Sequence, residues 1–362
     1  MNERLRIMQH APLQFYFNPC PRDFIVNEIP LYEASQSGEH LYILIRKKNL
    51  STFELIKILS NTLGVKSFEI GYAGLKDKNA LTTQAITLPK KILPLLEKFE
   101  HPQIKLLSIQ YHHNKIRIGH LKGNRFCMRL KKILPGEANR LESVLQKLKH
   151  SGIPNYFGYQ RFGKNQDNYI LAKKILQGEA KMRDKKKREF LFSALQSHLF
   201  NQWLNKRIQL SLLLQEFKPK DIAHLYPQIH LESLYKQPHF FKILQGDILT
   251  HYPFGQFFEA VDLMQESLRF LKQDITPTGL ICGKKTKYST QEAAFFEEQF
   301  LEPLLQEEGT RRQAWVFLSD IEFIYFPQEA QGELHFSLPK GAYATTFLEQ
   351  LSNQQEFPKC DD

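Results

Sequence analysis

The sequence predicts an α+β fold in which a mixed or antiparallel sheet with helices is built from both ends of the chain. Two observations support this: β-rich runs lie near both termini, and a long helix-rich region separates them. We therefore predict a discontinuous domain of residues 1–152 and 312–362, with a helix-rich α/β domain of residues 153–311 inserted into it. The hydrophobic content, 42% of 362 residues, is enough for one large domain or two ordinary ones.

The first part of the chain alternates short strands with one helix. Residues 24–26 and 41–45 are rich in β-branched and aromatic side chains, which predicts two strands. Ser51 and Glu54 have the spacing of a capping box and precede an apolar stripe of helical period, so a helix is predicted to begin there. Another strand is predicted over 68–72.

The same patterns predict the remaining elements. Strands are expected at 106–111, 116–118, 125–130, 314–318, 321–326 and 333–337. Helices are expected at 135–149, 188–207, 292–307 and 344–351. The change of pattern near Pro154, and the return of strands after it, sets the bounds of the inserted domain.

The chain is strongly basic, with a formal net charge of +11 at pH 7. An excess of Lys and Arg favours polyanions as partners. The alternative is a basic but otherwise ordinary soluble protein. The densest basic run, residues 185–188, is either a solvated helix face or a contact with a phosphate backbone.

Cysteine use and hydropathy indicate a soluble protein of the reducing cytoplasm. The four cysteines are far apart and form no C-x-x-C pair, which predicts neither a disulfide framework nor a structural metal. His112 and His113 are adjacent but have no third ligand at suitable spacing. The sequence contains no run of 18 apolar residues, and its first ten residues are mixed and charged, so we expect no membrane association.

The stretch from Gly71 to Gln84 has the residues best suited to chemistry. Gly74 permits a close or positive-φ turn after a strand, where functional residues are often displayed. Asp77 follows between two lysines, which favour its ionised form, and an ionised carboxylate can act as a nucleophile or a base. The lysines can also contact phosphates. By itself, this pattern is more typical of a solvated surface turn than of a catalytic site.

Residues Ala73 to Gln84 resemble the signature A-G-x-K-D-K-x-A-x-T-x-Q of the TruD family of pseudouridine synthases at each fixed position. Further blocks are similar to the family's pattern and occur in its order, at 21–26, 38–40, 46–52, 121–126, 154–163, 193–201 and 338–345. Arg22 stands where an acid is usual, and Ala342 where a serine is usual. The resemblance is weakest at 208–240. It implies that the discontinuous domain is catalytic and that the insertion is a TRUD domain.

The resemblance implies a reaction and a catalytic residue. The motif's aspartate is Asp77, which would act at the ribose of a target uridine by attacking C1′ or by removing the C2′ proton. The freed uracil would rotate and rejoin through C5, so neither a metal nor another cofactor is required. The implied substrate is tRNA, modified at uridine 13, and we expect binding to depend on RNA shape and phosphate contacts.

Other candidate site residues follow from the matched blocks. Phe126 could stack on an extruded uracil and Asn124 could read its edge or support the ribose, although Phe126 could instead be a core residue. Lys76 and Lys78 are candidates for orienting the RNA backbone or are merely solvated. Arg161 could contact a phosphate or pair with an acid.

Two other functions are compatible with the sequence. A non-catalytic RNA-binding or RNA-folding protein on the same fold would keep the basic surface but not depend on Asp77. A metal-dependent nuclease would need clustered acids or histidines at ligand spacing, which the sequence does not show. We expect a monomer.

Overall fold

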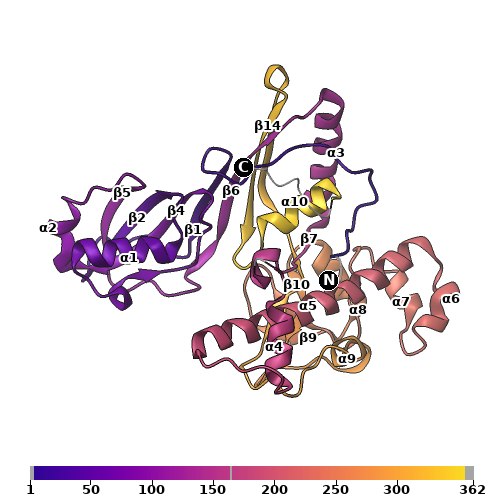
Figure 1. Ribbon diagram of the computed structural model, residues 1–362. Coiled ribbons are helices and arrows are strands. Elements are labelled where there is room, and N and C mark those ends of the chain that lie inside the picture. Colours follow the sequence, from indigo (N-terminus) through magenta and orange to yellow (C-terminus); the bar gives the residue numbers. More distant parts are fainter. Residues whose placement is uncertain (1–3, 164, 355–362) are drawn as a thin grey trace. The chain divides into compact units, whose positions relative to one another are not determined.

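The computed structural model describes residues 4–163 and 165–354, which form two compact units (Figure 1). The sheet unit comprises the described residues of Leu13–Leu145 and Leu318–Gly341. The helical unit comprises those of Met1–Pro12, Gln146–Phe317 and Ala342–Gln355. The predicted α+β class is confirmed by both units.

The division into units differs from the predicted domain bounds at the ends of the chain. The prediction groups residues 4–12 and 342–354 with the strands, whereas in the structure they belong to the helical unit. The reason is local pairing: Arg4, which forms a buried ion pair with Glu349, also donates to the carbonyl of Phe157 at 3.3 Å, and Leu5 N donates to Asn205 Oδ1 at 3.1 Å. The assignment of catalytic and TRUD domains stays a prediction.

An eight-stranded sheet forms the sheet unit, in the order β13-β14-β6-β1-β4-β2-β5 with β3 paired to β4. β1 and β4 are parallel, and the other pairs are antiparallel. The strands are β1 (Phe24–Pro30), β2 (His40–Lys48), β3 (Gly71–Tyr72), β4 (Leu81–Pro89), β5 (Ile104–His112), β6 (Leu121–Lys131), β13 (Ser319–Phe326) and β14 (Gln331–Pro339).

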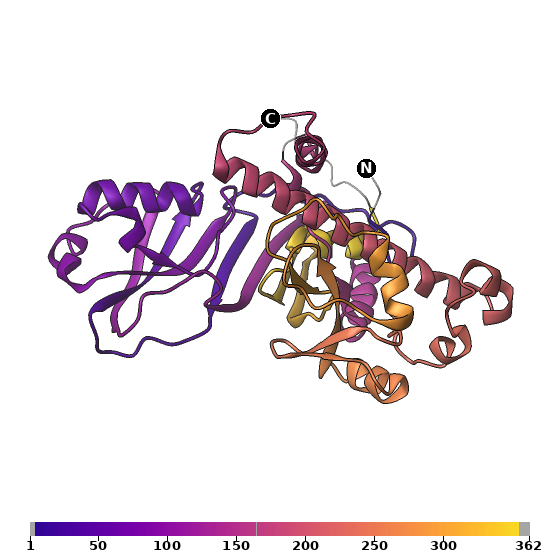
Figure 2. The ribbon, with the colours of Figure 1, turned by 90° about the horizontal axis from the view of Figure 1, so that it is seen from below.

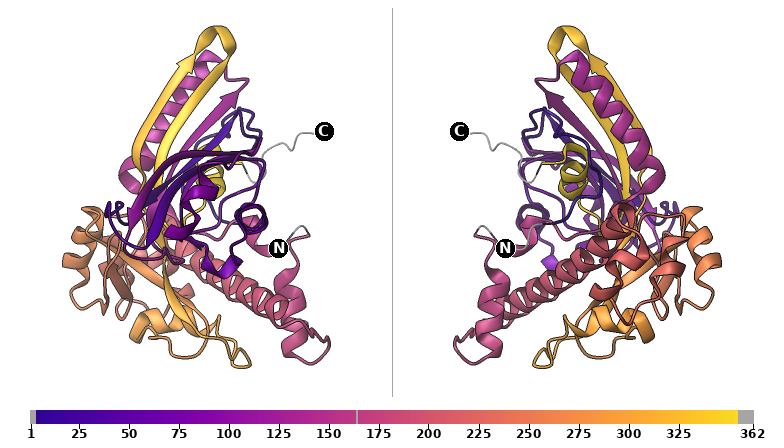
Figure 3. Two further views of the ribbon diagram at one scale, coloured as in Figure 1. Left: turned by 90° about the vertical axis from the view of Figure 1, so that its left-hand side faces the viewer. Right: turned by 90° about the vertical axis from the view of Figure 1, so that its right-hand side faces the viewer.

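The helices of this unit are α1 (Thr52–Leu63), the short α2 (Leu93–Leu96) and the first part of α3 (Pro135–Ser151), with 3-10 turns η1 (Ser67–Glu69), η2 (Lys90–Ile92) and η5 (Pro327–Glu329). The first part of α3 lies along the β13–β14 hairpin (Figure 3). Two contacts fix it: Tyr325 Oη donates to the carbonyl of Ile133 just before α3 at 2.9 Å, and Ile133 packs near Gly332.

The two faces of the sheet are packed differently. On one face, the α1 face, Leu41, Ile43 and Ile86 pack against apolar side chains of α1 such as Leu55 and Leu59. On the opposite face, Tyr42 and Ala85 pack with Ala73, Ile116 and Leu121. Alternate residues of a strand point to opposite faces, so these two clusters show on which face of the sheet each strand residue lies.

The strand register shows which residues of β1 and β6 lie on the α1 face. Lys47 of β2 and Val26 of β1 are both paired with Thr82 of β4. Val26 is in turn paired with Phe126, and Glu28 with Asn124. The α1 face therefore carries Lys47, Glu28, Asn124 and Phe126.

The helical unit has a four-stranded sheet, β11-β10-β8-β9, and a two-stranded sheet, β12-β7. Its strands are β7 (Ile153–Pro154), β8 (Ile248–His251), β9 (Phe257–Glu259), β10 (Ile275–Ile281), β11 (Thr310–Gln313) and β12 (Trp315–Val316). Its helices are η3 (Tyr159–Phe162), α4 (Asn168–Leu176), α5 (Lys185–Glu216), α6 (Pro219–Ile222), η4 (Ala223–Leu225), α7 (Leu231–Tyr235), α8 (Leu263–Leu271), α9 (Gln291–Glu298) and α10 (Ala344–Ser352).

The long helix α5 extends along this unit (Figure 2). Arg207 of α5 is buried and donates two 2.7 Å hydrogen bonds to Asp247. A second buried pair joins Arg311 to Glu297. The segment where the resemblance is weakest, 208–240, covers the end of α5 together with α6 and α7.

Several predicted elements are wrong in extent or type. Residues 67–69 form a 3-10 turn, so the strand predicted over 68–72 is reduced to Gly71–Tyr72. Residues 116–118 form a loop rather than a strand, because Ile116 N donates to a side chain, Thr87 Oγ1, and not to a ladder. The helix predicted over 292–307 ends at Glu298.

No helix among the described residues is long and apolar enough to span a membrane. Cytoplasmic location stays a prediction.

Candidate active site

The start of α1 provides the frame for the candidate site. Ser51 caps the helix: its hydroxyl accepts from Glu54 N at 3.2 Å, and Ser51 N donates to Glu54 Oε2 at 2.7 Å. The predicted capping box is confirmed. Lys78 donates to Glu54 Oε1 at 2.7 Å, and this hydrogen bond is the main reason that the pKa of Glu54 is lowered to about 2.

Thr52, the first residue of α1, joins the helix to the loop before β4 and to β4 itself. Its Oγ1 accepts a hydrogen bond from Lys76 N at 2.9 Å and donates to Gln84 Oε1 at 3.1 Å. The side chain of Thr52 is fully buried. One hydroxyl therefore connects three segments of the chain.

Lys76 is held by a buried ion pair. Its Nζ lies 2.6 Å from Glu28 Oε2, and the two side chains are 3% and 1% exposed. The other oxygen of Glu28 accepts from Ala85 N at 3.2 Å. Because its ammonium points at Glu28, Lys76 holds the loop to β1 and β4. A contact of Lys76 with the RNA backbone stays a prediction.

Lys47 supports the same loop from β2. Its buried Nζ donates to the Leu50 carbonyl and lies 3.5 Å from the backbone carbonyl of Asp77. Burial lowers the pKa of Lys47 to about 8, and the charge of Asp77 opposes this shift. Lys47 was not among the predicted site residues, because its burial depends on how β2 is packed.

Asp77 lies on this loop, between buried Lys76 and exposed Lys78, and is itself half-buried. The residues on both sides of Asp77 are held in place: Glu28 and Thr52 bind Lys76, and Glu54 binds Lys78. Lys47 contacts the backbone carbonyl of Asp77 itself. Such anchoring limits the movement of the carboxylate, which is what catalysis by a positioned group requires.

Gly74, which permits a close or positive-φ turn, is not among the glycines of the described chain that have a positive φ. A Cβ at Gly74 would lie 3.6 Å from Lys76 Nζ, an ordinary contact. Neither backbone conformation nor a close approach therefore requires glycine at position 74.

Asn124 lies beside Glu28 on the α1 face. Its Oδ1 is buried and has no hydrogen-bond partner among the described residues. The same holds for Gln84 Nε2 and Thr82 Oγ1 on β4 of this face. Buried polar atoms without partners are unfavourable by about 1–3 kcal/mol each, so these atoms are suited to binding a polar ligand.

Phe126 occupies a core position. Its ring is 5% exposed and is stacked between Phe24 and Phe336, with centroid distances of 6.2 and 5.1 Å. This arrangement favours the core interpretation. Stacking of Phe126 on a uracil stays a prediction.

Arg161 belongs to the helical unit, whereas the other predicted site residues belong to the sheet unit. Its guanidinium donates to the hydroxyls of Ser193 and Ser197 on α5, the latter at 3.2 Å. These contacts join the 154–163 and 193–201 blocks of the sequence to each other. A phosphate contact by Arg161 stays a prediction.

One group in the described chain has ligand atoms close enough to consider a metal: Cys127, Glu333 and His335, all within 4.8 Å of one another. Glu333 is already bonded to Arg129 at 2.7 Å, and arginines such as Arg22 line the adjacent pocket. This positive surrounding opposes a cation. Cys127 and His335 are 208 residues apart, which is why sequence spacing does not reveal the group.

The Asp77 loop is anchored to the sheet face that carries the unpartnered atoms Asn124 Oδ1 and Gln84 Nε2. A fixed carboxylate and free polar atoms on one face suit an enzyme that acts on a polar substrate. Comparison with known proteins identifies the kind of enzyme. The sequence model of the family tRNA pseudouridine synthase D (TruD) matches residues 1–185 and 182–351. The chain belongs to this family, and the predicted family and enzyme class, an isomerase, are confirmed.

Individual relatives agree with the family. A tRNA pseudouridine synthase D of Wolinella succinogenes is 53% identical over 356 residues, covering 98% of this chain and 99% of the relative. One from Helicobacter pylori strain J99 is 48% identical, covering 97% and 96%. A crystal structure from Methanosarcina mazei, named TruD, superposes with a TM-score of 0.64 at 21% identity, covering 97% and 96% of the two chains. This last likeness concerns the fold.

Proposed function

We propose that this chain converts uridine 13 of tRNA to pseudouridine and that Asp77 supplies the essential carboxylate. The observation that carries the proposal is the anchoring of the Asp77 loop by the buried Lys76–Glu28 pair, by Thr52 and by Lys47. A loop held from two strands and a helix is built to present one group in one place. Exposed turns do not need such a network.

The charges around Asp77 favour its ionised form, since Lys47 and Asp77 attract each other. An ionised carboxylate can attack C1′ of the uridine, which breaks the C1′–N1 bond and leaves its electron pair on the uracil. Alternatively it takes the C2′ proton as that bond breaks, which gives a glycal. In both routes C5 then bonds to C1′ and loses its proton, while Asp77 is released or returns the proton to C2′.

Asn124 is proposed to bind the extruded uracil, because its Oδ1 is buried without a partner on the face that also carries Glu28. A base edge or a ribose hydroxyl can donate to this oxygen. Phe126, two residues further along the same strand, supports Asn124 from the core. Lys78, which is exposed, and Arg161 are proposed to meet RNA phosphates.

The test is tritium release from tRNA that carries uridine labelled at C5. Wild type should release tritium from the tRNA, and Asp77→Asn should not, although it binds the tRNA equally well. The matched control is Asp320→Asn, an exposed acid whose contact with Arg125 is 3.6 Å, and it should stay active.

A second substrate identifies the position. A tRNA with cytidine at position 13 should release no tritium from its other uridines. Release that persists with this tRNA would contradict the position, and wild-type protein that binds tRNA without any release would favour the non-catalytic RNA-binding alternative. Monomeric state and cytoplasmic location stay predictions.

A further inference from the structure

A pocket that the proposed reaction does not use lies in the sheet unit, on the face opposite α1. Its volume is about 470 Å³, within the range of small-molecule sites. Tyr42 of β2 and Ala85 of β4 belong to its lining and also to the cluster that packs the face opposite α1. The loop between β5 and β6 contributes most of the remaining lining residues.

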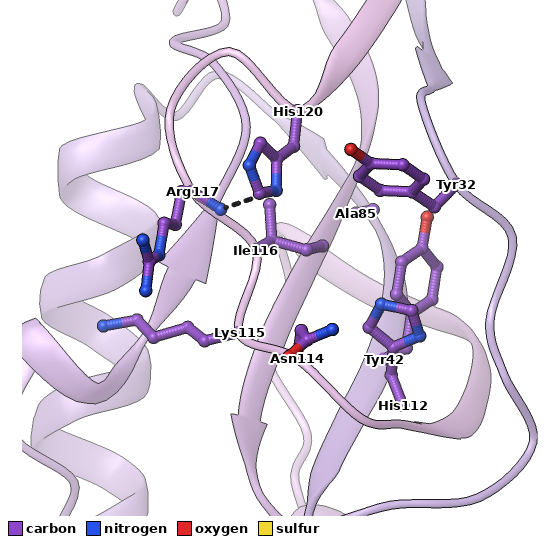
Figure 4. A pocket seen from close by; sticks show the side chains of 9 residues that line it. All are labelled: Tyr32, Tyr42, Ala85, His112, Asn114, Lys115, Ile116, Arg117 and His120. Atoms are coloured by element: carbon purple, nitrogen blue, oxygen red, sulfur yellow. Dashed lines mark hydrogen bonds between the residues drawn. The ribbon is translucent and has the colours of Figure 1, made fainter.

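Four aromatic rings gather on one side of this loop (Figure 4). The ring of Tyr32 meets that of His120 edge to face, with centroids 5.6 Å apart, and Tyr42 meets His112 in the same way at 5.5 Å. Tyr32 is 54% exposed, so its ring is available to a ligand. Rings of Tyr and His are the surfaces on which proteins stack unpaired RNA bases.

The polar groups of the pocket favour a ligand with a negative charge. Lys115 and Arg117 extend from the other side of the loop, and in this view Asn114 lies between them and the ring of His112 (Figure 4). None of the nine residues that line the pocket is acidic. One side of the loop thus offers aromatic rings and an amide. The other offers the cations of Arg117 and of Lys115, whose Nζ also donates to the carbonyl of Phe68.

The pocket is held in place before any ligand binds. Ser35 N donates to His112 Nδ1 at 3.2 Å, and Ile116 N donates to Thr87 Oγ1 at 3.0 Å. Gly119 N donates to the carbonyl of Ala73 at 2.8 Å, where the Asp77 loop begins. A preformed site loses less entropy on binding.

We infer that this pocket binds one unstacked nucleotide, its base among the four rings and its phosphate at Lys115 and Arg117. The inference rests on the proposed function in one respect: RNA is the expected source of the nucleotide, which would be a residue other than the target uridine. A free nucleotide has the same chemistry, and the experiment separates the two sources.

The experiment measures the dissociation constant of a tRNA transcript for the Asp77→Asn protein at fixed salt, with and without Tyr32→Ala or Asn114→Ala. Each change should weaken binding, Tyr32→Ala by about tenfold, as expected for removing one stacking ring. Phe326→Ala is the matched control, because Phe326 is an exposed ring of the same unit, on β13, outside the pocket. It should leave the affinity unchanged.

Binding of free UMP and AMP to the same proteins identifies the source. If the variants bind tRNA more weakly and no mononucleotide binds, the pocket is assigned to an RNA residue. If mononucleotides bind in a way that needs Tyr32 and tRNA binding is unchanged, the pocket is assigned to a free nucleotide. If neither Tyr32→Ala nor Asn114→Ala changes the affinity for any of these probes, the inference is overturned. Wild type that releases no tritium but whose tRNA binding needs Tyr32 would refute the proposed function and retain this one.

Discussion

Lys76 and Glu28 form a buried ion pair at 2.6 Å, and the residue that follows Lys76 is the candidate catalytic Asp77. The partners are 48 residues apart and join the loop to β1. A lone buried charge is strongly unfavourable, so each partner depends on the other. The position of Asp77 on its loop thus depends on Glu28, a residue of β1.

Removing one partner of this pair should destabilise the protein more than removing both. Lys76→Met leaves Glu28 buried and unpaired, which should lower the free energy of unfolding by about 3–5 kcal/mol in urea denaturation. Glu28→Gln combined with Lys76→Met should recover most of that loss. The double variant should still have a lower kcat for tritium release with an unchanged KM, because the loop has lost its anchor to β1.

The control for this prediction is Lys285→Met, which breaks an ion pair with Glu308 whose side chains are both 79% exposed. Exposed pairs contribute about 0–1 kcal/mol, so the change in stability should be small. Equal losses in Lys76→Met and Lys285→Met would show that the buried pair is not needed.

Thr52 should act on the site through its hydroxyl. Thr52→Val keeps the shape but leaves Lys76 N without its acceptor, which should cost about 1–3 kcal/mol of unfolding free energy and lower kcat. Thr52→Ser retains the hydroxyl and should restore both quantities. The prediction fails if the valine and serine variants have the same kcat.

The lowered pKa of Lys47 predicts how the stability of the protein depends on pH. Its pKa in the folded protein is about 8, below the value of 10.5 for a free lysine, so between these values the unfolded chain binds more protons. Stability therefore rises with pH across about 8 to 10.5, relative to a variant without the ammonium. The difference in unfolding free energy between wild type and Lys47→Met, measured from pH 7 to 10, should increase in favour of wild type.

Tritium release should depend on the same group. Loss of the Lys47 proton weakens its attraction to Asp77, so wild-type kcat should fall above about pH 8. Lys47→Met should start from a lower kcat and show no such fall. An identical pH profile in the two proteins would contradict this role.

The sequence predicts local features of the site well and its long-range support poorly. The capping box of Ser51 and Glu54 depends on residues three apart, and the structure has it. The motif around Asp77 is likewise contiguous. In contrast, the Glu28–Lys76 pair and the burial of Lys47 follow from strand register, which no short pattern encodes.

Two fold errors have similar causes. Residues 116–118 have the composition of a strand, but the tertiary hydrogen bond from Ile116 N to Thr87 Oγ1 replaces the ladder. The helix predicted to 307 ends at Glu298, and Pro303 further along lacks the N–H that a continuing helix would use. Apolar periodicity alone detects neither.

Asn124 and Phe126 should separate substrate binding from core packing. Asn124 Oδ1 has no partner in the described chain, so Asn124→Ala breaks no hydrogen bond of this oxygen and should not lower the unfolding free energy. It should nevertheless reduce kcat/KM for tritium release by about tenfold, the worth of one hydrogen bond to the base or ribose. Asn27→Ala is the matched control, since Asn27 is paired with Arg125 on the opposite face and should keep full activity.

Phe126→Ala should behave in the opposite way, because its ring is buried between Phe24 and Phe336. Removing a buried phenylalanine typically costs about 3–5 kcal/mol of unfolding free energy, and any loss of activity should follow the loss of folded protein. A Phe126→Ala protein that stays stable but inactive would instead make Phe126 a direct contact of the uracil. Full activity in Asn124→Ala would remove Asn124 from the site.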